Sequence, residues 1–177
     1  IEGSLKERID LIREEAETAV REGSTCLVLS DKDISNQKAS IPSILTVGAV
    51  HSHLVKHGLR GYCSLNVECS DALDTHSFAI LIGIGATTVN PYLAIDSIYQ
   101  RFEKKLFGKS DFETCVNKFK KSIDAGLLKI MSKMGISVIS SYRGGCNFEA
   151  VGLSRAIVSD YFPGMSSRIS GIGIIGI

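Results

Sequence analysis

Helical and strand-like segments alternate along the first hundred residues, and this alternation constrains the fold more than any other feature. Segments with helical periodicity cover residues 4–23, 42–58 and 71–84, and a further one begins at Pro91. Short apolar runs typical of buried strands lie between them, at residues 26–30, 62–69 and 86–90. Because a helix separates each strand from the next, neighbouring strands must run parallel. The sequence therefore predicts an α/β fold in which helices cover a parallel sheet.

Local signals mark the ends of these helices. Ser4 followed by Glu7 has the spacing of a capping box, and Gly23 is a typical helix terminator. Pro42 and Pro91 stand where a first helical turn tolerates proline. These residues support the predicted boundaries independently of hydrophobic periodicity.

Composition excludes several classes of protein. The chain has 177 residues, of which 44% are hydrophobic and 22% charged, and its net charge of +1 predicts neither a nucleic-acid partner nor an anionic membrane partner. The longest strongly apolar run, residues 78–84, is far shorter than the roughly 20 residues that cross a bilayer. Five irregularly spaced cysteines predict reduced thiols in a cytoplasmic protein. The start at Ile1 and the apolar ending GIGIIGI predict a fragment of a longer protein.

The pattern changes after the fourth helix, and we expect a domain boundary near residues 100–110. An apolar stripe with helical spacing then runs from Phe112 to Met134, and Gly126 is expected to divide it into two helices. Gly135 ends this helical region. We predict a strand over residues 136–141, a sharp turn at 143–145 and a helix that begins at Asn147.

The turn after the predicted strand is a candidate ligand site. In parallel α/β folds, ligands bind at the carboxyl ends of the strands. Gly144 and Gly145 would let the backbone approach a ligand closely, and Arg143 offers a planar group with five donors that suits phosphate or carboxylate. A phosphate-bearing cofactor or an acidic substrate would fit here. The alternative is a plain tight turn without a ligand.

Two long stretches carry a resemblance to a known family. Residues 126–174, GLLKIMSKMGISVISSYRGGCNFEAVGLSRAIVSDYFPGMSSRISGIGI, resemble the start of the flavin domain of glutamate synthases, and residues 48–95 are similar to the end of their central domain. The Gly-Gly-Cys sequence after Arg143 is closer to the pyridine-nucleotide-linked bacterial type, which implies an NADPH-linked enzyme.

This resemblance implies a central-domain α/β segment over residues 1–105 and the first β/α unit of an FMN-binding (β/α) barrel, of the TIM-barrel kind, over residues 106–177. The parent enzyme would be an iron–sulfur flavoprotein oxidoreductase of ammonia assimilation. It makes L-glutamate from 2-oxoglutarate and glutamine-derived ammonia with its remaining domains and a small NADPH-oxidising subunit. We expect this fragment alone to be inactive. The alternative is a non-catalytic α/β remnant or scaffold that binds no cofactor.

The resemblance also assigns site residues, none of them catalytic. The expected contacts of a partial FMN site are Ser140, Ser141, Tyr142, Arg143, Gly144 and Gly145. Glu149 resembles a carboxylate near the exit of the ammonia tunnel, where it would hydrogen-bond ammonia. The alternative for Glu149 is an acidic residue in the first turn of a helix, favoured by the helix dipole.

Histidines and cysteines are not expected to bind metal. His53 and His57 have the i, i+4 spacing of a metal pair, but we expect them to be packed or interface residues. Cys63 and Cys69 have the spacing of two cysteines of the family's iron–sulfur triplet, yet Asp74 stands at the third position. We therefore predict that these are buried cysteines and that the cluster ligands are absent from this chain.

Overall fold

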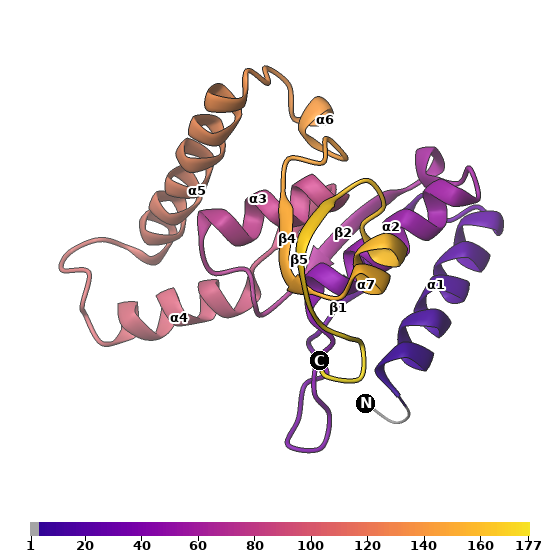
Figure 1. Cartoon of the computed structure of the whole chain (residues 1–177). Coiled ribbons are helices and arrows are strands. Elements are labelled where there is room, and N and C mark those ends of the chain that lie inside the picture. The colour runs from indigo at the N-terminus through magenta and orange to yellow at the C-terminus, as the bar shows by residue number, and fades with distance from the viewer. Residues whose placement is uncertain (1–3) are drawn as a thin grey trace.

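A computed structural model describes residues 4–177, which form seven α-helices and five strands (Figure 1). The helices are α1 (Leu5–Arg21), α2 (Ser43–Lys56), α3 (Thr75–Ile84), α4 (Tyr92–Glu103), α5 (Phe112–Met134), α6 (Ile139–Tyr142) and α7 (Arg155–Tyr161). The strands are β1 (Cys26–Ser30), β2 (Ser64–Glu68), β3 (Thr88–Asn90), β4 (Glu149–Leu153) and β5 (Ser166–Ile172). A short 3₁₀ helix, Arg60–Tyr62, precedes β2.

The first three strands form a parallel sheet in the order β1-β2-β3. Leu27 on β1 pairs with Leu65 on β2, and Val67 pairs with Val89 on β3. This confirms the predicted parallel α/β arrangement and places all three predicted strands within two residues of their expected bounds. The capping box at Ser4 and Glu7 is also present, because each residue binds the backbone amide of the other.

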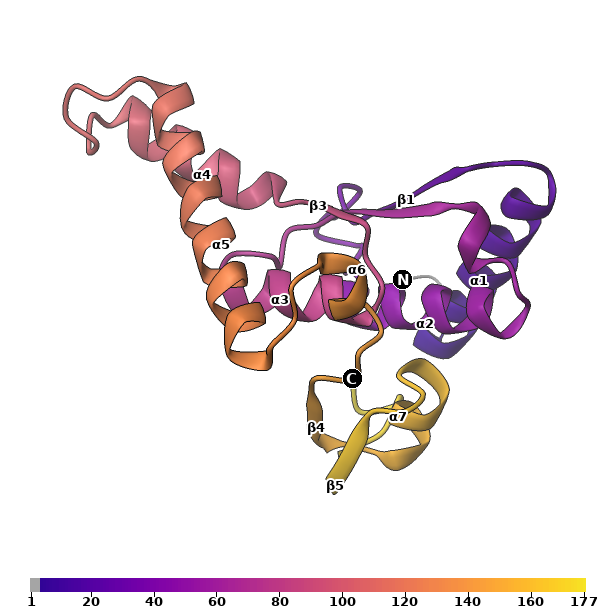
Figure 2. The ribbon, with the colours of Figure 1, turned by 90° about the horizontal axis from the view of Figure 1, so that it is seen from above.

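Helices α1, α2 and α3 cover one face of this sheet (Figure 2). Val47, Val50 and Leu54 of α2 are fully buried in the core together with Leu65 of β2. The opposite face carries hydrogen-bonded polar side chains. Thr88 donates to the side chain of Asn66 at 2.6 Å, and Val28 on the same face is 61% exposed. In this structure helices therefore cover one face of the sheet. Apolar and polar residues alternate along the strands, so that one face is apolar and the other polar.

Helix α5 is continuous, so the prediction that Gly126 divides it is wrong. A side chain at Gly126 would collide with Thr75 at the start of α3. The missing side chain thus lets α5 pass close to α3, where Phe119 also contacts Phe78 edge-on at 6.3 Å between ring centroids. Glycine costs a helix only about 1 kcal/mol relative to alanine, and such packing offsets that cost.

Residues 136–141 do not form the predicted strand. Gly135 ends α5 in the left-handed conformation, and residues 139–142 form the short helix α6. Ile136 and Tyr142 pack against the α3 and α5 cluster, whereas Val138 and Ile139 stay exposed. Alternating apolar residues require a partner strand, and none lies beside this segment in the part of the chain that the structure describes.

The predicted helix from Asn147 is likewise wrong at its start, because residues 149–153 form strand β4. Gly152 has a φ of +80°, which a helix interior does not accommodate. β4 runs parallel to β5, and α7 connects the two. The chain therefore contains a β-α-β unit, but its first strand begins 13 residues later than the predicted start at residue 136.

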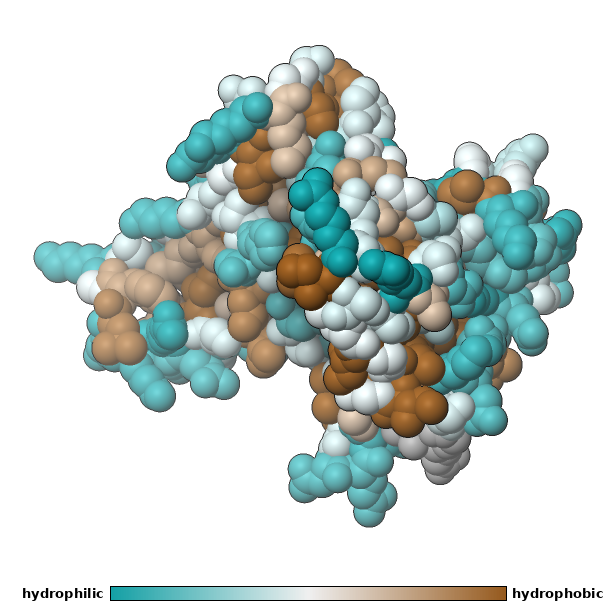
Figure 3. Space-filling view, in the orientation of Figure 1, coloured by the Kyte–Doolittle hydropathy of each residue, from teal (hydrophilic) through white to brown (hydrophobic). Residues whose placement is uncertain are grey.

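The β4-α7-β5 unit lies on the side of the helical layer that faces away from the first sheet (Figure 2). Arg13 of α1 holds it there. The guanidinium pairs with the Asp160 carboxylate at 3.2 Å, donates to the Ala49 carbonyl on α2 and lies 4.6 Å from the centre of the Tyr161 ring. Val151, Ile169 and Ile172 of this unit are exposed, and the surface over β4 and β5 mixes apolar and hydrophilic residues (Figure 3).

The contact between α2 and α7 depends on Gly48. A side chain there would collide with the Phe162 ring and lie 2.9 Å from the Tyr161 carbonyl oxygen. We expect Gly48→Val to lower the free energy of unfolding by about 1–3 kcal/mol through overpacking. Urea titration of the 177-residue chain followed by circular dichroism measures this change. Gly61→Val is the matched control, since a β-carbon at Gly61 meets no atom within 4 Å. Equal effects of the two substitutions would contradict the prediction.

Candidate functional site

The predicted flavin residues lie in α6 and the turn that follows it, not at the carboxyl end of a strand. Ser140 and Ser141 are exposed residues of α6. Tyr142 points inward, is only 1% exposed and meets Phe148 edge-on at 6.2 Å between ring centroids. Its hydroxyl group has no hydrogen-bond partner among the described residues, and burial raises the pKa of Tyr142. The structure thus separates the two serines from the tyrosine.

Arg143 and Gly144 attach the turn to the end of α3. Arg143 Nε donates to the Ala86 carbonyl at 3.1 Å, and the Gly144 amide donates to the Gly83 carbonyl at 2.7 Å. The Gly145 amide bonds within the turn, and Gly144 has a φ of +73° that favours glycine. Both amides are therefore already used. The groups that stay available are the two serine hydroxyl groups and the rest of the Arg143 guanidinium. They do not form a complete FMN cradle, and they define no catalytic step.

Glu149 is the first residue of β4 rather than a residue in the first turn of a helix. Its carboxylate lies 3.3 Å from Arg168 Nε on β5, in an exposed ion pair. This contact keeps the carboxylate on the β4-β5 sheet. The helix-dipole alternative for Glu149 is wrong, and its role toward ammonia stays a prediction.

A partly buried hydrogen-bond network centred on Arg60 lies beside the turn. Arg60 donates to His51 Nδ1 at 3.0 Å, to the Cys63 carbonyl at 2.6 Å and to the Gly85 carbonyl at 2.8 Å. Burial, with smaller effects of Arg60 and Arg143, lowers the pKa of His51 to about 4. His51 is therefore neutral near pH 7, accepts through Nδ1 and keeps its proton on Nε2.

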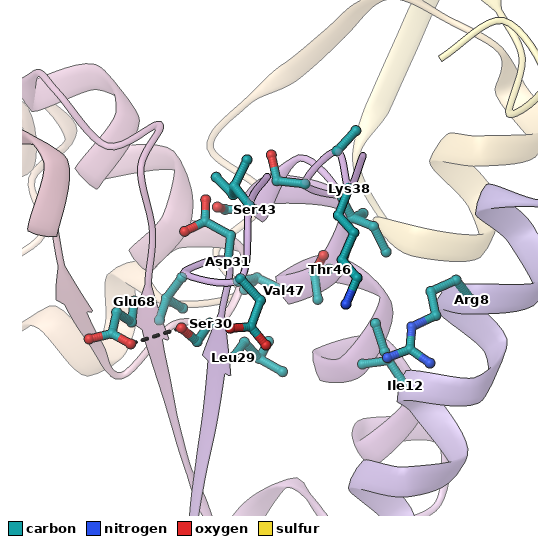
Figure 4. Close-up of a pocket in the computed structure, with 16 residues that line it drawn as sticks. Arg8, Ile12, Leu29, Ser30, Asp31, Lys38, Ser43, Thr46, Val47 and Glu68 are labelled. Carbon is teal, nitrogen blue, oxygen red and sulfur yellow. Dashed lines mark hydrogen bonds between the residues drawn. The ribbon is translucent and has the colours of Figure 1, made fainter. Parts of the chain in front are cut away.

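A cavity of about 430 Å³ opens at the carboxyl ends of β1 and β2 (Figure 4). Parallel α/β sheets bind ligands at this edge. Arg8 and Lys38 point into the cavity from one side, and Ser30, Asp31 and Glu68 lie on the other. The cavity suits a small polar molecule. The sequence analysis does not indicate this cavity, although the acidic Asp31, directly after the predicted strand at residues 26–30, is a usable signal.

The acidic side of this cavity is held in place by hydrogen bonds. The Glu68 carboxylate accepts from Ser30 Oγ at 2.8 Å and pairs with Lys32 at 2.7 Å. Lys32 and Ser30 lower the pKa of Glu68, so it stays ionised at neutral pH and is unsuited to donate a proton. Asp31 Oδ2 accepts from the Ser70 hydroxyl and amide groups, whereas its Oδ1 is buried without a partner among the described residues.

Cys63 and Cys69 flank β2 and are both buried, which confirms the prediction made for them. Burial, followed by the nearby Asp71 charge, raises the pKa of Cys69 to about 11. A thiol that stays protonated is a poor metal ligand and a poor nucleophile.

Comparison with known proteins identifies the family of this chain. The profile described as "Glutamate synthase central domain" matches residues 1–154. The chain belongs to the glutamate synthase central-domain family. Among curated proteins, it is 57% identical over 174 residues to the glutamate synthase [NADPH] large chain of Azospirillum brasilense, a match that covers 98% of the chain. It is 44% identical over 162 residues, 90% of the chain, to the corresponding protein of Bacillus subtilis.

A ferredoxin-dependent glutamate synthase from Pyropia yezoensis is 42% identical over 183 residues, and its match covers 97% of the chain. The electron donors in these names therefore differ among similar relatives. The chain spans only 12% of the length of the Azospirillum and Pyropia proteins and 10% of the Bacillus protein. The expected boundary at 105/106 falls inside the central-domain match and stays a prediction. Within residues 4–177, no helix has both the length and the apolar character needed to cross a membrane.

The Arg60 network should stabilise this central-domain segment. Arg60→Gln leaves several buried acceptors without a donor, each of which costs about 1–3 kcal/mol. We expect the free energy of unfolding to fall by about 2–4 kcal/mol in urea titrations. Arg101→Gln, at an exposed position near the end of α4, is the control and should change it by less than about 0.5 kcal/mol. A loss below about 1 kcal/mol for Arg60→Gln would contradict this account.

Neutral His51 should make stability depend on pH. Its folded-state pKa of about 4 lies below the ordinary histidine pKa of 6.5, so its contribution to stability is complete above pH 6.5 and is lost as the pH falls toward 4. We expect a loss of about 2–3 kcal/mol across this window in unfolding titrations. His51→Asn keeps an acceptor for Arg60 but cannot become protonated, so its stability should fall less steeply. Parallel pH profiles of the two chains would show that His51 is not the responsible group.

Proposed function

We propose that this chain forms the end of the central domain and the start of the FMN-binding barrel of a glutamate synthase. The parent enzyme would make L-glutamate from 2-oxoglutarate and glutamine-derived ammonia. The observation that carries this proposal is the 57% identity over 98% of the chain to a large chain named glutamate synthase [NADPH]. That match continues beyond residue 154, where the central-domain match ends.

The β4-α7-β5 unit supports a barrel start at the end of the chain. Its two strands are parallel and form a sheet separate from β1-β2-β3. A (β/α) barrel is built from such units, each adding one strand beside the last. The exposed Val151, Ile169 and Ile172 are an apolar surface that further barrel elements would cover.

The chemistry belongs to the assembled parent. FMN, when bound there, would supply hydride transfer to the imine formed from 2-oxoglutarate and ammonia. In this proposal Ser140–Gly145 contribute part of the FMN surroundings, and Glu149 lies near the path of ammonia. The remaining domains would supply the iron–sulfur ligands, and a small NADPH-oxidising subunit in the cytoplasm would supply electrons.

A chimera tests this proposal. The 177 residues would replace the matching segment of the Azospirillum large chain, and the product would be co-expressed with that enzyme's small subunit. We expect a soluble complex that contains FMN and forms glutamate from glutamine and 2-oxoglutarate, measured by NADPH oxidation. The 177-residue chain alone should form none. A soluble chimera that contains FMN but makes no glutamate, or glutamate formation by the chain alone, would overturn the proposal.

A scaffold without cofactor contacts is the second candidate, and the internal bonds of Arg143 and Gly144 favour it. Replacing both Ser140 and Ser141 by alanine in the chimera separates the two. If the hydroxyl groups bind FMN, two lost hydrogen bonds of about 1 kcal/mol each should weaken FMN binding about thirtyfold. Ser122→Ala, at an exposed position of α5, is the matched control. Unchanged FMN affinity in the double variant would support the scaffold role for this turn.

A further inference from the structure

Three potential metal ligands meet where α1 packs on α2. Glu17 of α1 places its Oε2 atom 2.6 Å from His53 Nε2 and 3.8 Å from His57 Nδ1. His53 lies in the last turn of α2, and His57 directly follows that helix. One ligand atom from each residue can be chosen so that all three lie within 4.8 Å of one another.

This donor set and its spacing suit a divalent transition metal. Imidazole nitrogen and carboxylate oxygen bind Zn²⁺ at about 2.0–2.2 Å, which places the donor atoms of a tetrahedral site about 3.4 Å apart. Reaching this geometry requires the Glu17–His53 contact to lengthen and the His57 ring to turn from the His53 carbonyl, which it contacts at 2.8 Å. Both changes are rotations of side chains at the edge of the helix pair, and the backbone already holds the three residues together.

Arg21 orients the Glu17 carboxylate. Its Nε and Nη2 atoms both lie 2.8 Å from Glu17 Oε1, so Oε2 is directed toward the histidines. The hydrogen bond from Arg21, with a smaller effect of His53, lowers the pKa of Glu17 and keeps the carboxylate ionised. Such outer contacts orient ligands in known metal sites.

The exposure of the cluster leaves room for a water ligand. The side chains of Glu17, His53 and His57 are 21%, 19% and 35% exposed. Three protein ligands with one position open to solvent is a recognised coordination pattern for zinc. The i, i+4 histidine pair was visible in the sequence, but Glu17 comes from another helix, 36 residues before His53.

We propose that Glu17, His53 and His57 bind one divalent transition metal ion, with Zn²⁺ as the physiological candidate, which fastens α1 to α2. The site lies outside the residues assigned to FMN or ammonia, so it is independent of the proposed function. Because the ion binds the folded chain, it stabilises it by about 2.7 kcal/mol at a free concentration 100 times its Kd.

Cobalt and zinc titrations of the 177-residue chain test this proposal. We expect one Co²⁺ per chain with the visible absorption bands of a four-coordinate ion, displaced by Zn²⁺, and a Zn²⁺-dependent rise in the thermal midpoint. His57→Gln and Glu17→Gln should weaken binding at least about tenfold, because each removes a ligand. His76→Gln removes an exposed histidine on α3 and should leave binding unchanged. Circular dichroism confirms that each variant is folded.

Thiols are the competing source of metal binding, since Cys26 and Cys146 are exposed. The titrations are therefore repeated with both cysteines replaced by serine. Binding that survives this replacement and is lost in His57→Gln supports the site. Binding that disappears with the cysteines, binding unaffected by both ligand variants, or no saturable Co²⁺ binding would overturn the proposal and leave the cluster as an ion-paired helix contact.

Discussion

Helix α2 is packed on two opposite sides, and the remaining structure depends on this constraint. Val47, Val50 and Leu54 face the first sheet and are fully buried. On its other side, Gly48 admits the Phe162 ring, and Ser52 donates to the Asp160 carbonyl at 3.3 Å. A helix with two buried faces must be apolar almost all round, and α2 contains no acidic residue. Burial on both sides sets the separation between the sheet and the β4-α7-β5 unit.

Two arginines connect segments that lie far apart in the sequence. Arg13 joins α1 to α2 and α7, and Arg60 joins the entry of β2 to the turn between α3 and β3. Each donates to two backbone carbonyl groups: Arg13 to those of Ala49 and Asp160, and Arg60 to those of Cys63 and Gly85. Arginine suits this task because its planar group presents several donors in fixed directions. In a junction between a central domain and a proposed barrel, the contacts of Arg13 fix the orientation of one unit on the other, whereas those of Arg60 stay within the first unit.

Local patterns predicted most of the first hundred residues. The strand predicted at residues 26–30 has the same bounds as β1, and the Ser4–Glu7 capping box is present as expected. Beyond the first hundred residues, the expected helix end at Gly135 is also present. The predicted candidate site was less accurate. Residues 140–145 lie in one short helix and the turn that follows it. However, Tyr142 is buried, and the short helix stands where a strand was expected. The cavity lined by Arg8, Lys38 and Glu68 joins three distant segments, so no local motif indicates it.

The sequence by itself determined the α/β alternation, the helix caps and the family, because these depend on residues within a few positions of one another or on direct similarity. Only the tertiary structure decided that residues 149–153 form a strand, that Gly126 lies inside a continuous helix and that Glu17 joins His53 and His57. Each of these outcomes rests on a partner distant in the sequence: β5 for the strand, Thr75 for the glycine and α2 for the carboxylate. A short segment with mixed propensity adopts the conformation whose backbone bonds and apolar contacts a neighbour completes.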